Sequence, residues 1–287
     1  MFDESARGSS LLFRPYTVEV TSGDRKSVAV AIESLPKGTE VFVANLPTDT
    51  SADLVDACKQ LSAAGLSPVP HIVARNIPDE PTLKNLLREL AAQADVKSAL
   101  CLAGDRDKPV GALSDSLQLI RTGAFQDAGI GRLFISCYPE GHPRIPDGVI
   151  RQARLDKLKA INDAGLEAVL MSQFCFESGP YLSMLREIRS QGITAPVRIG
   201  VSGPANVAKL MKYAIACGVG ASMRALKEKQ GLASMVLFGE TPDEIIADVS
   251  AAVEQDPSLG EVGIHYFTLG SLKKTLEWLQ RHRAEMA

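Results

Sequence analysis

Eight short runs rich in β-forming residues alternate along this chain with longer stretches whose apolar residues recur at helical spacing. This alternation is typical of a parallel sheet whose strands are joined by crossover helices. Some runs are apolar almost throughout, as expected for a sheet covered on both faces. The predicted strands are Tyr16–Thr21, Glu40–Asn45, Ser67–Val73, Ser98–Ala103, Arg132–Tyr138, Ala168–Gln173, Val197–Val201 and Val262–Thr268.

Such a sheet can stay open or close into a barrel. An open sheet that binds a dinucleotide would carry Gly-x-Gly-x-x-Gly after its first strand, and the segment Glu19–Arg25 does not match it. The sequence also lacks a Walker-type Gly-Lys-Ser/Thr motif. We therefore predict an α/β fold of the (β/α)8 TIM-barrel type. The interval from Val201 to Val262 has room for two or three helices, which predicts extra helices between strands seven and eight.

Several helix boundaries are readable in the sequence. Ser51 is a suitable N-cap for one helix, and Ala64-Gly65 is a suitable end for it. Pro81 takes a first-turn position in the next helix. Thr241 is the predicted cap of a later helix, with Pro242 at its first position.

Composition limits the classes of function. The chain has 287 residues, 45% hydrophobic and 23% charged, without a linker rich in Gly, Ser or Pro, so we predict one domain over residues 1–287. The net charge of -3 and the lack of a basic run exclude a nucleic-acid footprint. No apolar stretch approaches the ~20 residues of a membrane span, and residues 1–14 do not resemble a signal peptide. We expect a cytoplasmic protein without a membrane partner.

The cysteines are odd in number and far apart in sequence, which fits neither a disulfide framework nor a zinc site. We predict that they are small buried hydrophobic residues, and no metal site is predicted. The five are Cys58, Cys101, Cys137, Cys175 and Cys217.

Polar side chains lie within or just after the predicted strands, towards the carboxyl ends at which a barrel places its chemistry. Glu19 lies between two valines, where a carboxylate is costly unless it is used or paired; a structural ion pair is the alternative. Asp105 could instead cap a helix or lie in a turn, and His71 could be a core histidine. No strand ends in the lysine of a Schiff-base aldolase, and no Gly-x-Ser-x-Gly elbow occurs. The other polar residues at these ends are Asn45, Tyr138, Glu140, His142 and Gln173.

Together these strings resemble the methylenetetrahydrofolate reductase family. The most specific are Tyr138-Pro-Glu-Gly-His-Pro143 and Ser172-Gln-Phe-Cys-Phe-Glu177. The others are Val18-Glu19-Val20, Pro70-His71, Gly104-Asp105, Asp163-Ala-Gly165 and His265-Tyr-Phe-Thr-Leu269.

The resemblance implies a flavin-dependent barrel that interconverts 5,10-methylenetetrahydrofolate and 5-methyltetrahydrofolate in one-carbon metabolism and methionine biosynthesis. It makes Glu19 the general acid and Asp105 a catalytic residue that contacts the folate pterin near the flavin. It implies FAD as cofactor and tetrahydrofolate derivatives as partners. Folate contacts would also come from Gln173, Lys209 and Tyr213, and flavin contacts from Asn45, His71, Ala103, Gly104, Asp105, Tyr138 and His142.

The sequence departs from the family pattern at several positions. Ala103 stands where the family often has arginine, and Ser271 replaces another expected arginine. Lys157 or Lys159 would have to replace the family's basic pair at the flavin phosphate. Lys209 replaces a second glutamine that contacts folate. These changes leave the electron donor open between NADH, NADPH and another electron partner.

Two alternatives stand beside this reductase. One is a pterin-binding methyltransferase barrel without flavin; the other is a non-catalytic subunit that binds folate or flavin. The physiological direction stays open, as does a homo-oligomer. The amphipathic segment Leu272–Arg283 suits either packing on the core or an oligomer contact.

Overall fold

Eight strands follow one another in sequence order around a closed β-barrel, β1 to β8. In this computed structural model the described residues are 10–46, 48–205, 207–219, 241–269 and 271–285. The barrel confirms the predicted (β/α)8 fold, and every predicted strand is present to within one residue at each end. The strands are β1 Tyr16–Thr21, β2 Glu40–Ala44, β3 Ser67–Val73, β4 Ser98–Leu102, β5 Arg132–Cys137, β6 Glu167–Ser172, β7 Val197–Ser202 and β8 Val262–Phe267.

Helices separate the strands along the chain. Two of them, α9 and α11, lie between β7 and β8 in the described sequence, as the length of that interval predicted. The α-helices are α2 Arg25–Ser34, α3 Ser51–Ala63, α4 Glu80–Ala94, α5 Ser116–Arg121, α6 Ala124–Asp127, α7 Asp147–Asp163, α8 Ser178–Ser190, α9 Val207–Cys217, α11 Asp243–Gln255 and α12 Leu272–Glu285. Short 3-10 helices are η1 Leu11–Phe13, η2 Ala74–Asn76 and η3 Pro257–Leu259.

The chain divides into two compact units, each of which draws on separate stretches of sequence. The first unit comprises Met1–Val18, Cys137–Pro146 and Met171–Ala287, and the second comprises Glu19–Ser136 and Asp147–Leu170. The prediction of one domain over residues 1–287 stays a prediction.

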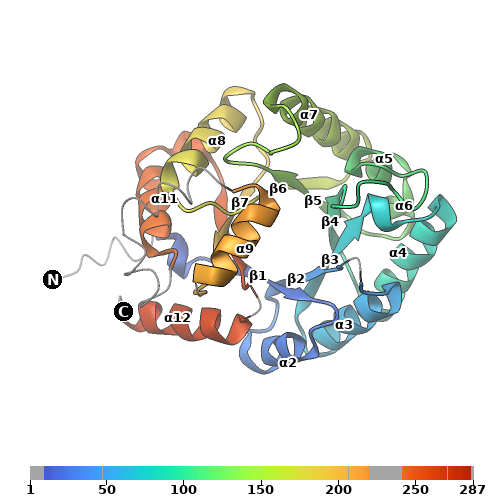
Figure 1. Cartoon of the computed structure of the whole chain (residues 1–287), viewed down its shortest axis with the longest axis horizontal. Helices are drawn as coiled ribbons and strands as arrows, with labels where there is room; N and C mark the ends of the chain where they lie inside the picture. The colour runs from blue at the N-terminus through green and yellow to red at the C-terminus, as the bar shows by residue number, and fades with distance from the viewer. Residues whose placement is uncertain (1–9, 47, 206, 220–240, 270, 286–287) are drawn as a thin grey trace. The chain divides into compact units, whose positions relative to one another are not determined.

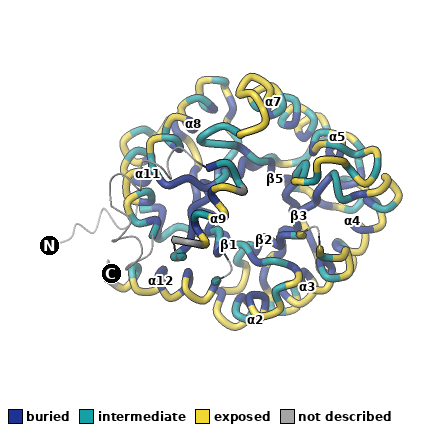
Figure 2. The backbone as a smooth tube through the Cα atoms, viewed as in Figure 1, coloured by how far each residue is buried: buried dark blue, intermediate teal, exposed yellow. Residues whose placement is uncertain are grey.

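The second unit packs aromatic and aliphatic side chains between its strands and helices. The rings of Phe42 and Phe134 meet edge to face with centroids 4.8 Å apart. At the amino ends of the strands, the guanidinium of Arg132 bonds the carboxylate of Glu40 and donates to Ser98 Oγ at 3.0 Å. In Figure 1, α3 and α4 lie side by side outside β2 and β3, and Figure 2 shows exposed residues on the outer sides of these helices.

Helix α12 packs its apolar side into the first unit. Leu272, Leu276, Trp278 and Leu279 are buried. Trp278 stands edge to face against Tyr266 of β8, with ring centroids 5.9 Å apart. The sequence left this segment open between packing on the core and an oligomer contact, and the burial of these side chains supports packing on the core.

Two predicted helix caps are wrong by one residue. Helix α3 is capped by Thr50, because its hydroxyl accepts the N–H of Asp53 while the Asp53 carboxylate accepts the N–H of Thr50. Ser51 is already the first helical residue. Helix α11 begins at Asp243, after Pro242, whose carbonyl accepts the first helical bond from Ile246 at 2.9 Å. Two acids in the first turn complement the helix dipole in place of a threonine cap.

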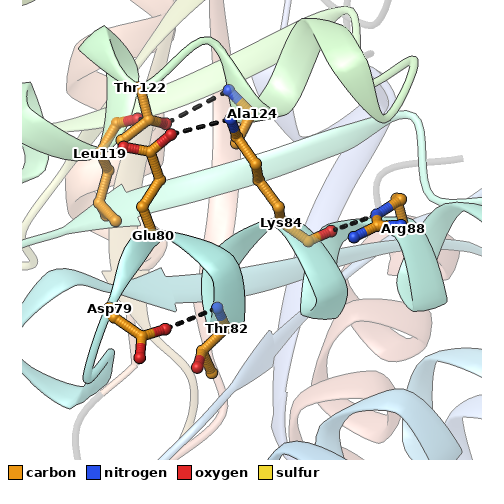
Figure 3. Close-up of polar contacts among 8 residues, drawn as sticks. All are labelled: Asp79, Glu80, Thr82, Lys84, Arg88, Leu119, Thr122 and Ala124. Atoms are coloured by element: carbon orange, nitrogen blue, oxygen red, sulfur yellow. Dashed lines mark hydrogen bonds and ion pairs between the residues drawn. The ribbon is translucent and has the colours of Figure 1, made fainter.

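The start of α4 confirms the predicted proline position. Asp79 caps the helix by accepting the N–H of Thr82 at 2.8 Å, and Pro81 lies in the first turn. The next residue, Glu80, forms an ion pair with Lys84 one turn further along the helix. The carbonyl of Lys84 accepts a hydrogen bond from Arg88 Nε, as Figure 3 shows.

Four of the five cysteines are buried, as predicted, whereas Cys217 is partly exposed and departs from that prediction. Burial raises the pKa of Cys101 and of Cys175 to about 12, so these thiols stay protonated at neutral pH.

Candidate functional site

Glu19 and His71 form a buried pair in the second unit. Glu19 lies on β1 with its side chain on the face opposite Val18 and Val20, since neighbouring strand residues alternate. His71 lies on β3, where its ring also contacts Phe42 edge to face. The distance from His71 Nε2 to Glu19 Oε2 is 3.4 Å, and the two side chains keep only 10% and 23% of their surface exposed.

Burial shifts the two pKa values in opposite directions. It raises the pKa of Glu19 to about 8 and lowers the pKa of His71 to about 4. The carboxyl group is therefore protonated and the imidazole neutral at pH 7. An ion pair between these two groups would require both to be charged, so their protonation states at neutral pH do not support an ion pair of Glu19 with His71. The functional role of Glu19 stays a prediction.

Asn45 follows β2 directly and carries an unusual polar atom. Its Oδ1 is buried and has no hydrogen-bond partner among the residues that the structure describes. A buried amide oxygen without a partner is costly, so this oxygen is available to accept a further hydrogen bond.

Asp105 lies in the loop between β4 and α5, and its side chain is exposed. The helix that follows is capped by Asp115, so Asp105 is not the helix cap that the sequence left open. Gly104 has a φ of +98°, and a Cβ there would lie 2.4 Å from Val73 Cγ1. This glycine lets the chain turn tightly against β3 before Asp105. Ala103, which precedes it, brings no charge to the loop.

The two lysines proposed for the flavin phosphate lie on different sides of α7. Lys157 is buried, and so is Arg154 one turn earlier. Lys157 lies close enough to Cys101 for its charge to act on the pKa of that thiol. Lys159 lies on the exposed side, where its Nζ pairs with Asp163 at 2.6 Å. Of the two lysines, only Lys157 faces the interior of the unit.

The first unit carries the remaining predicted residues. Tyr138 and His142 lie in the loop after β5 with ring centroids 5.3 Å apart, and His142 Nδ1 accepts the N–H of Arg144. Gln173 follows β6, and its side-chain oxygen accepts the N–H of Phe174 at 3.0 Å. The side-chain nitrogen of Gln173 is therefore the atom that can donate to another group. Lys209 and Tyr213 are exposed one turn apart on α9.

A buried pair that sequence reasoning missed lies between β1 and β8 in the first unit. Thr17 Oγ1 and His265 Nδ1 are 2.8 Å apart. Thr17 is two residues before Glu19 and so lies on the same face of β1. Strand alternation was the available signal, but the bond depends on the register that pairs Thr17 with His265.

Among the described residues, no group of three or more His, Cys, Asp or Glu side chains is arranged to hold a metal ion. Within the same part of the chain, no helix combines the length and apolar character that crossing a bilayer requires.

The fold and these residues define a (β/α)8-barrel protein with a mostly buried acid on a barrel strand. The chain belongs to the methylenetetrahydrofolate reductase family, whose model matches residues 34–229. The matched part includes Asn45, His71 and Asp105, whereas Glu19 lies before it.

The name of one similar protein agrees with this family. A probable methylenetetrahydrofolate reductase (NADPH) from Caenorhabditis elegans is 30% identical over 185 residues, which cover 59% of this chain and 27% of that protein. The chain thus spans about a quarter of that relative's length.

Two solved structures share the fold at 12% identity. One is an uncharacterized protein from Clostridium thermocellum that binds two copies of 5-methyl-5,6,7,8-tetrahydrofolic acid, with a TM-score of 0.63 and 94% coverage of both chains. The other is dihydropteroate synthase from Thermus thermophilus, with a TM-score of 0.50 and 95% coverage of both chains.

Proposed function

We propose that this chain is a flavin-dependent oxidoreductase that interconverts 5,10-methylenetetrahydrofolate and 5-methyltetrahydrofolate. Within the family, the observation that carries the proposal is Glu19, a buried carboxyl group that is protonated at neutral pH beside the neutral ring of His71. Opening of the folate one-carbon bridge requires an acid that is still protonated near neutral pH.

In the reducing direction, Glu19 donates its proton to the folate nitrogen that leaves the methylene bridge. The bridge then opens to an iminium, which accepts a hydride and becomes the methyl group. In the oxidising direction the same carboxylate takes the proton back. His71 stays neutral because burial lowers its pKa, so it does not stabilise the Glu19 carboxylate by charge, and the acid keeps its proton until a base is presented.

The residues of the second unit fit a flavin. Asn45 offers a buried oxygen that accepts a ring or ribityl donor, and Gly104 keeps the backbone beside β3 clear of a side chain. Lys157, and not the exposed Lys159, is the lysine we assign to the phosphate end. Bound FAD would supply the hydride transfer itself, while the protein holds and orients it. Tyr138 and His142 of the first unit keep the flavin-contacting roles that family membership suggests.

We assign the folate contacts to Asp105, Gln173, Lys209 and Tyr213. The exposed carboxylate of Asp105 can accept the N–H donors of a pterin, and the orientation of the Gln173 amide offers a donor. Lys209 and Tyr213 present a cation and an aromatic ring on one side of α9, which suits an anionic ligand with a planar ring.

An absorbance spectrum of the purified protein, followed by anaerobic titration with 5-methyltetrahydrofolate, NADH and NADPH, tests the proposal. We expect a flavin spectrum that bleaches with 5-methyltetrahydrofolate, and bleaching by one of the nicotinamides would identify the donor. Protein that is colourless, and stays so after incubation with FAD, would contradict the proposal and favour a pterin-binding methyltransferase. Bound flavin that no reductant bleaches would favour a non-catalytic subunit.

A further inference from the structure

One arginine of the second unit holds both ends of the loop that carries Asp105. Arg75 lies in η2, directly after β3, and the loop runs from residue 103 to residue 115 after β4. Arg75 Nε donates to the carbonyl of Ser114 at 2.9 Å, and Nη1 donates to the carbonyl of Arg106 at 2.8 Å. The two carbonyls are eight residues apart in sequence, so a single planar guanidinium closes the loop.

The backbone of Arg75 adds two further bonds to the same loop. Its N–H donates to the carbonyl of Ala103 at 3.0 Å, and its carbonyl accepts the N–H of Val110 at 3.0 Å. A loop without a helix or strand of its own must place its backbone hydrogen bonds elsewhere, and here four of them go to one residue.

Neighbours of Arg75 complete the contact between the two segments. Arg106 Nε donates to Asn76 Oδ1 at 2.7 Å. Gly111 packs so tightly that a Cβ there would lie 1.7 Å from the carbonyl oxygen of Pro78. The contact therefore has polar and steric parts, and both hold the loop against the segment that follows β3.

We propose that Arg75 is a positioning residue that fixes the Asp105 carboxylate for binding of the folate pterin. Asp105 is exposed and directly precedes Arg106, whose carbonyl the guanidinium holds. The loop backbone would otherwise lose conformational freedom when Asp105 binds a ligand, and the clamp removes that backbone part of the loss in advance. The clamp itself is a property of the fold, whereas the pterin as ligand rests on the proposed function.

Hydrogen exchange of the ligand-free protein tests the clamp. In Arg75→Met, we expect the amide of Val110 and its neighbours in residues 103–115 to exchange at least about tenfold faster, since both side-chain bonds are lost. Arg75→Lys keeps the positive charge but cannot make both hydrogen bonds at once. We therefore expect its amide exchange rates in residues 103–115 to lie between those of the wild type and those of Arg75→Met. Arg88→Met is the matched control, because Arg88 donates within its own helix, as Figure 3 shows, and should leave the loop unchanged.

Calorimetric titration with 5-methyltetrahydrofolate tests the positioning role. We expect Arg75→Met to weaken binding about tenfold while the same change in an Asp105→Asn background has little further effect, as for two residues that act as a unit. A merely structural role would weaken binding equally in both backgrounds. Asn76→Ala removes the separate bond to Arg106 and should weaken binding in the same direction, which keeps the test open if Arg75→Met does not fold.

The outcomes separate this inference from the proposed function. Wild-type protein that binds 5-methyltetrahydrofolate while Arg75→Met and Asn76→Ala bind it equally well would overturn the positioning role alone. Effects of Arg75→Met and Asp105→Asn that simply add would overturn it too. Wild-type protein that does not bind 5-methyltetrahydrofolate would overturn both proposals, and unchanged exchange in residues 103–115 would overturn the clamp whatever binds.

Discussion

At the scale of single residues, the surroundings of Glu19 decide its chemistry. The neutral ring of His71 lies beside the carboxyl group without supplying a positive charge. Desolvation by burial raises the pKa of the carboxyl group to about 8. The same burial lowers the pKa of His71, so both groups are neutral near pH 7.

Replacement of Glu19 by Gln tests the acid directly. Glu19→Gln keeps nearly the same shape but has no proton to donate, so we expect flavin to stay bound and folate turnover to fall by at least ~100-fold. Glu89→Gln, an exposed glutamate on α4, is the control and should keep wild-type turnover. Turnover near that of the wild type in Glu19→Gln would refute the role of general acid.

The pH dependence of the reducing direction follows from the raised pKa. The acid is protonated below about pH 8 and loses its proton above it. We expect kcat/KM for 5,10-methylenetetrahydrofolate to fall about tenfold for each pH unit above that value, as for one ionisation in the unliganded protein. Stopped-flow rates between pH 6 and pH 10 would measure this, and a decline of tenfold per pH unit that is already under way at pH 6 would contradict it.

At the scale of elements, loops and caps set where each functional group stands. Gly104 adopts a left-handed backbone and lets the chain turn beside Val73. Asp105 and the residues after it then lie in a loop that Arg75 clamps. At α3, the reciprocal bonds of Thr50 and Asp53 fix the residue at which the helix begins.

The capping box of α3 gives a prediction about stability. Thr50→Ala removes the hydroxyl that accepts the Asp53 N–H, and we expect the free energy of unfolding to fall by about 1 kcal/mol. Ser51→Ala changes the adjacent residue, which is already helical, and should have little effect. Urea unfolding of both variants measures the difference, and equal losses would contradict the assignment of the cap.

At the scale of the whole molecule, burial of ionisable groups couples folding to pH. An unfolded glutamate has a pKa of 4.5, and Glu19 in the folded protein has one of about 8. Between these values the unfolded state binds fewer protons, so the stability that Glu19 contributes is complete below pH 4.5 and is lost as the pH rises through about 8. His71 acts in the opposite sense: its contribution is lost as the pH falls from 6.5 towards 4.

Thermal unfolding of Glu19→Gln and the wild type at pH 5 and pH 8 tests this coupling. Glutamine does not ionise, so we expect the Tm of the variant relative to the wild type to be higher at pH 8 than at pH 5 by at least about 3 °C. Glu89→Gln should show no such change, because its exposed side chain loses little hydration on folding. A constant difference for Glu19→Gln would mean that the carboxyl group is not desolvated in the fold.

Much of the barrel could be predicted because its signals are local. Strand β5 is apolar along nearly all of Arg132–Cys137, and the alternation of strand and helix patterns limits the topology to a few choices. The two errors in the predicted helix caps also concern local structure. Ser51 and Thr241 are good caps by residue type, but the choice of cap depends on which carbonyl accepts the first helical bond.

The sequence by itself determined the order of the elements, the strands that carry Glu19 and His71, the loop that carries Asp105, and the family resemblance. Only the tertiary structure decided that Glu19 meets His71, that Lys159 points away from the side on which Lys157 is buried, and that Arg75 holds the Asp105 loop. The physical reason is the separation in sequence over which each kind of interaction acts. Periodicity and capping act between residues a few positions apart, whereas desolvation and cross-loop hydrogen bonds depend on residues brought together from distant parts of the chain.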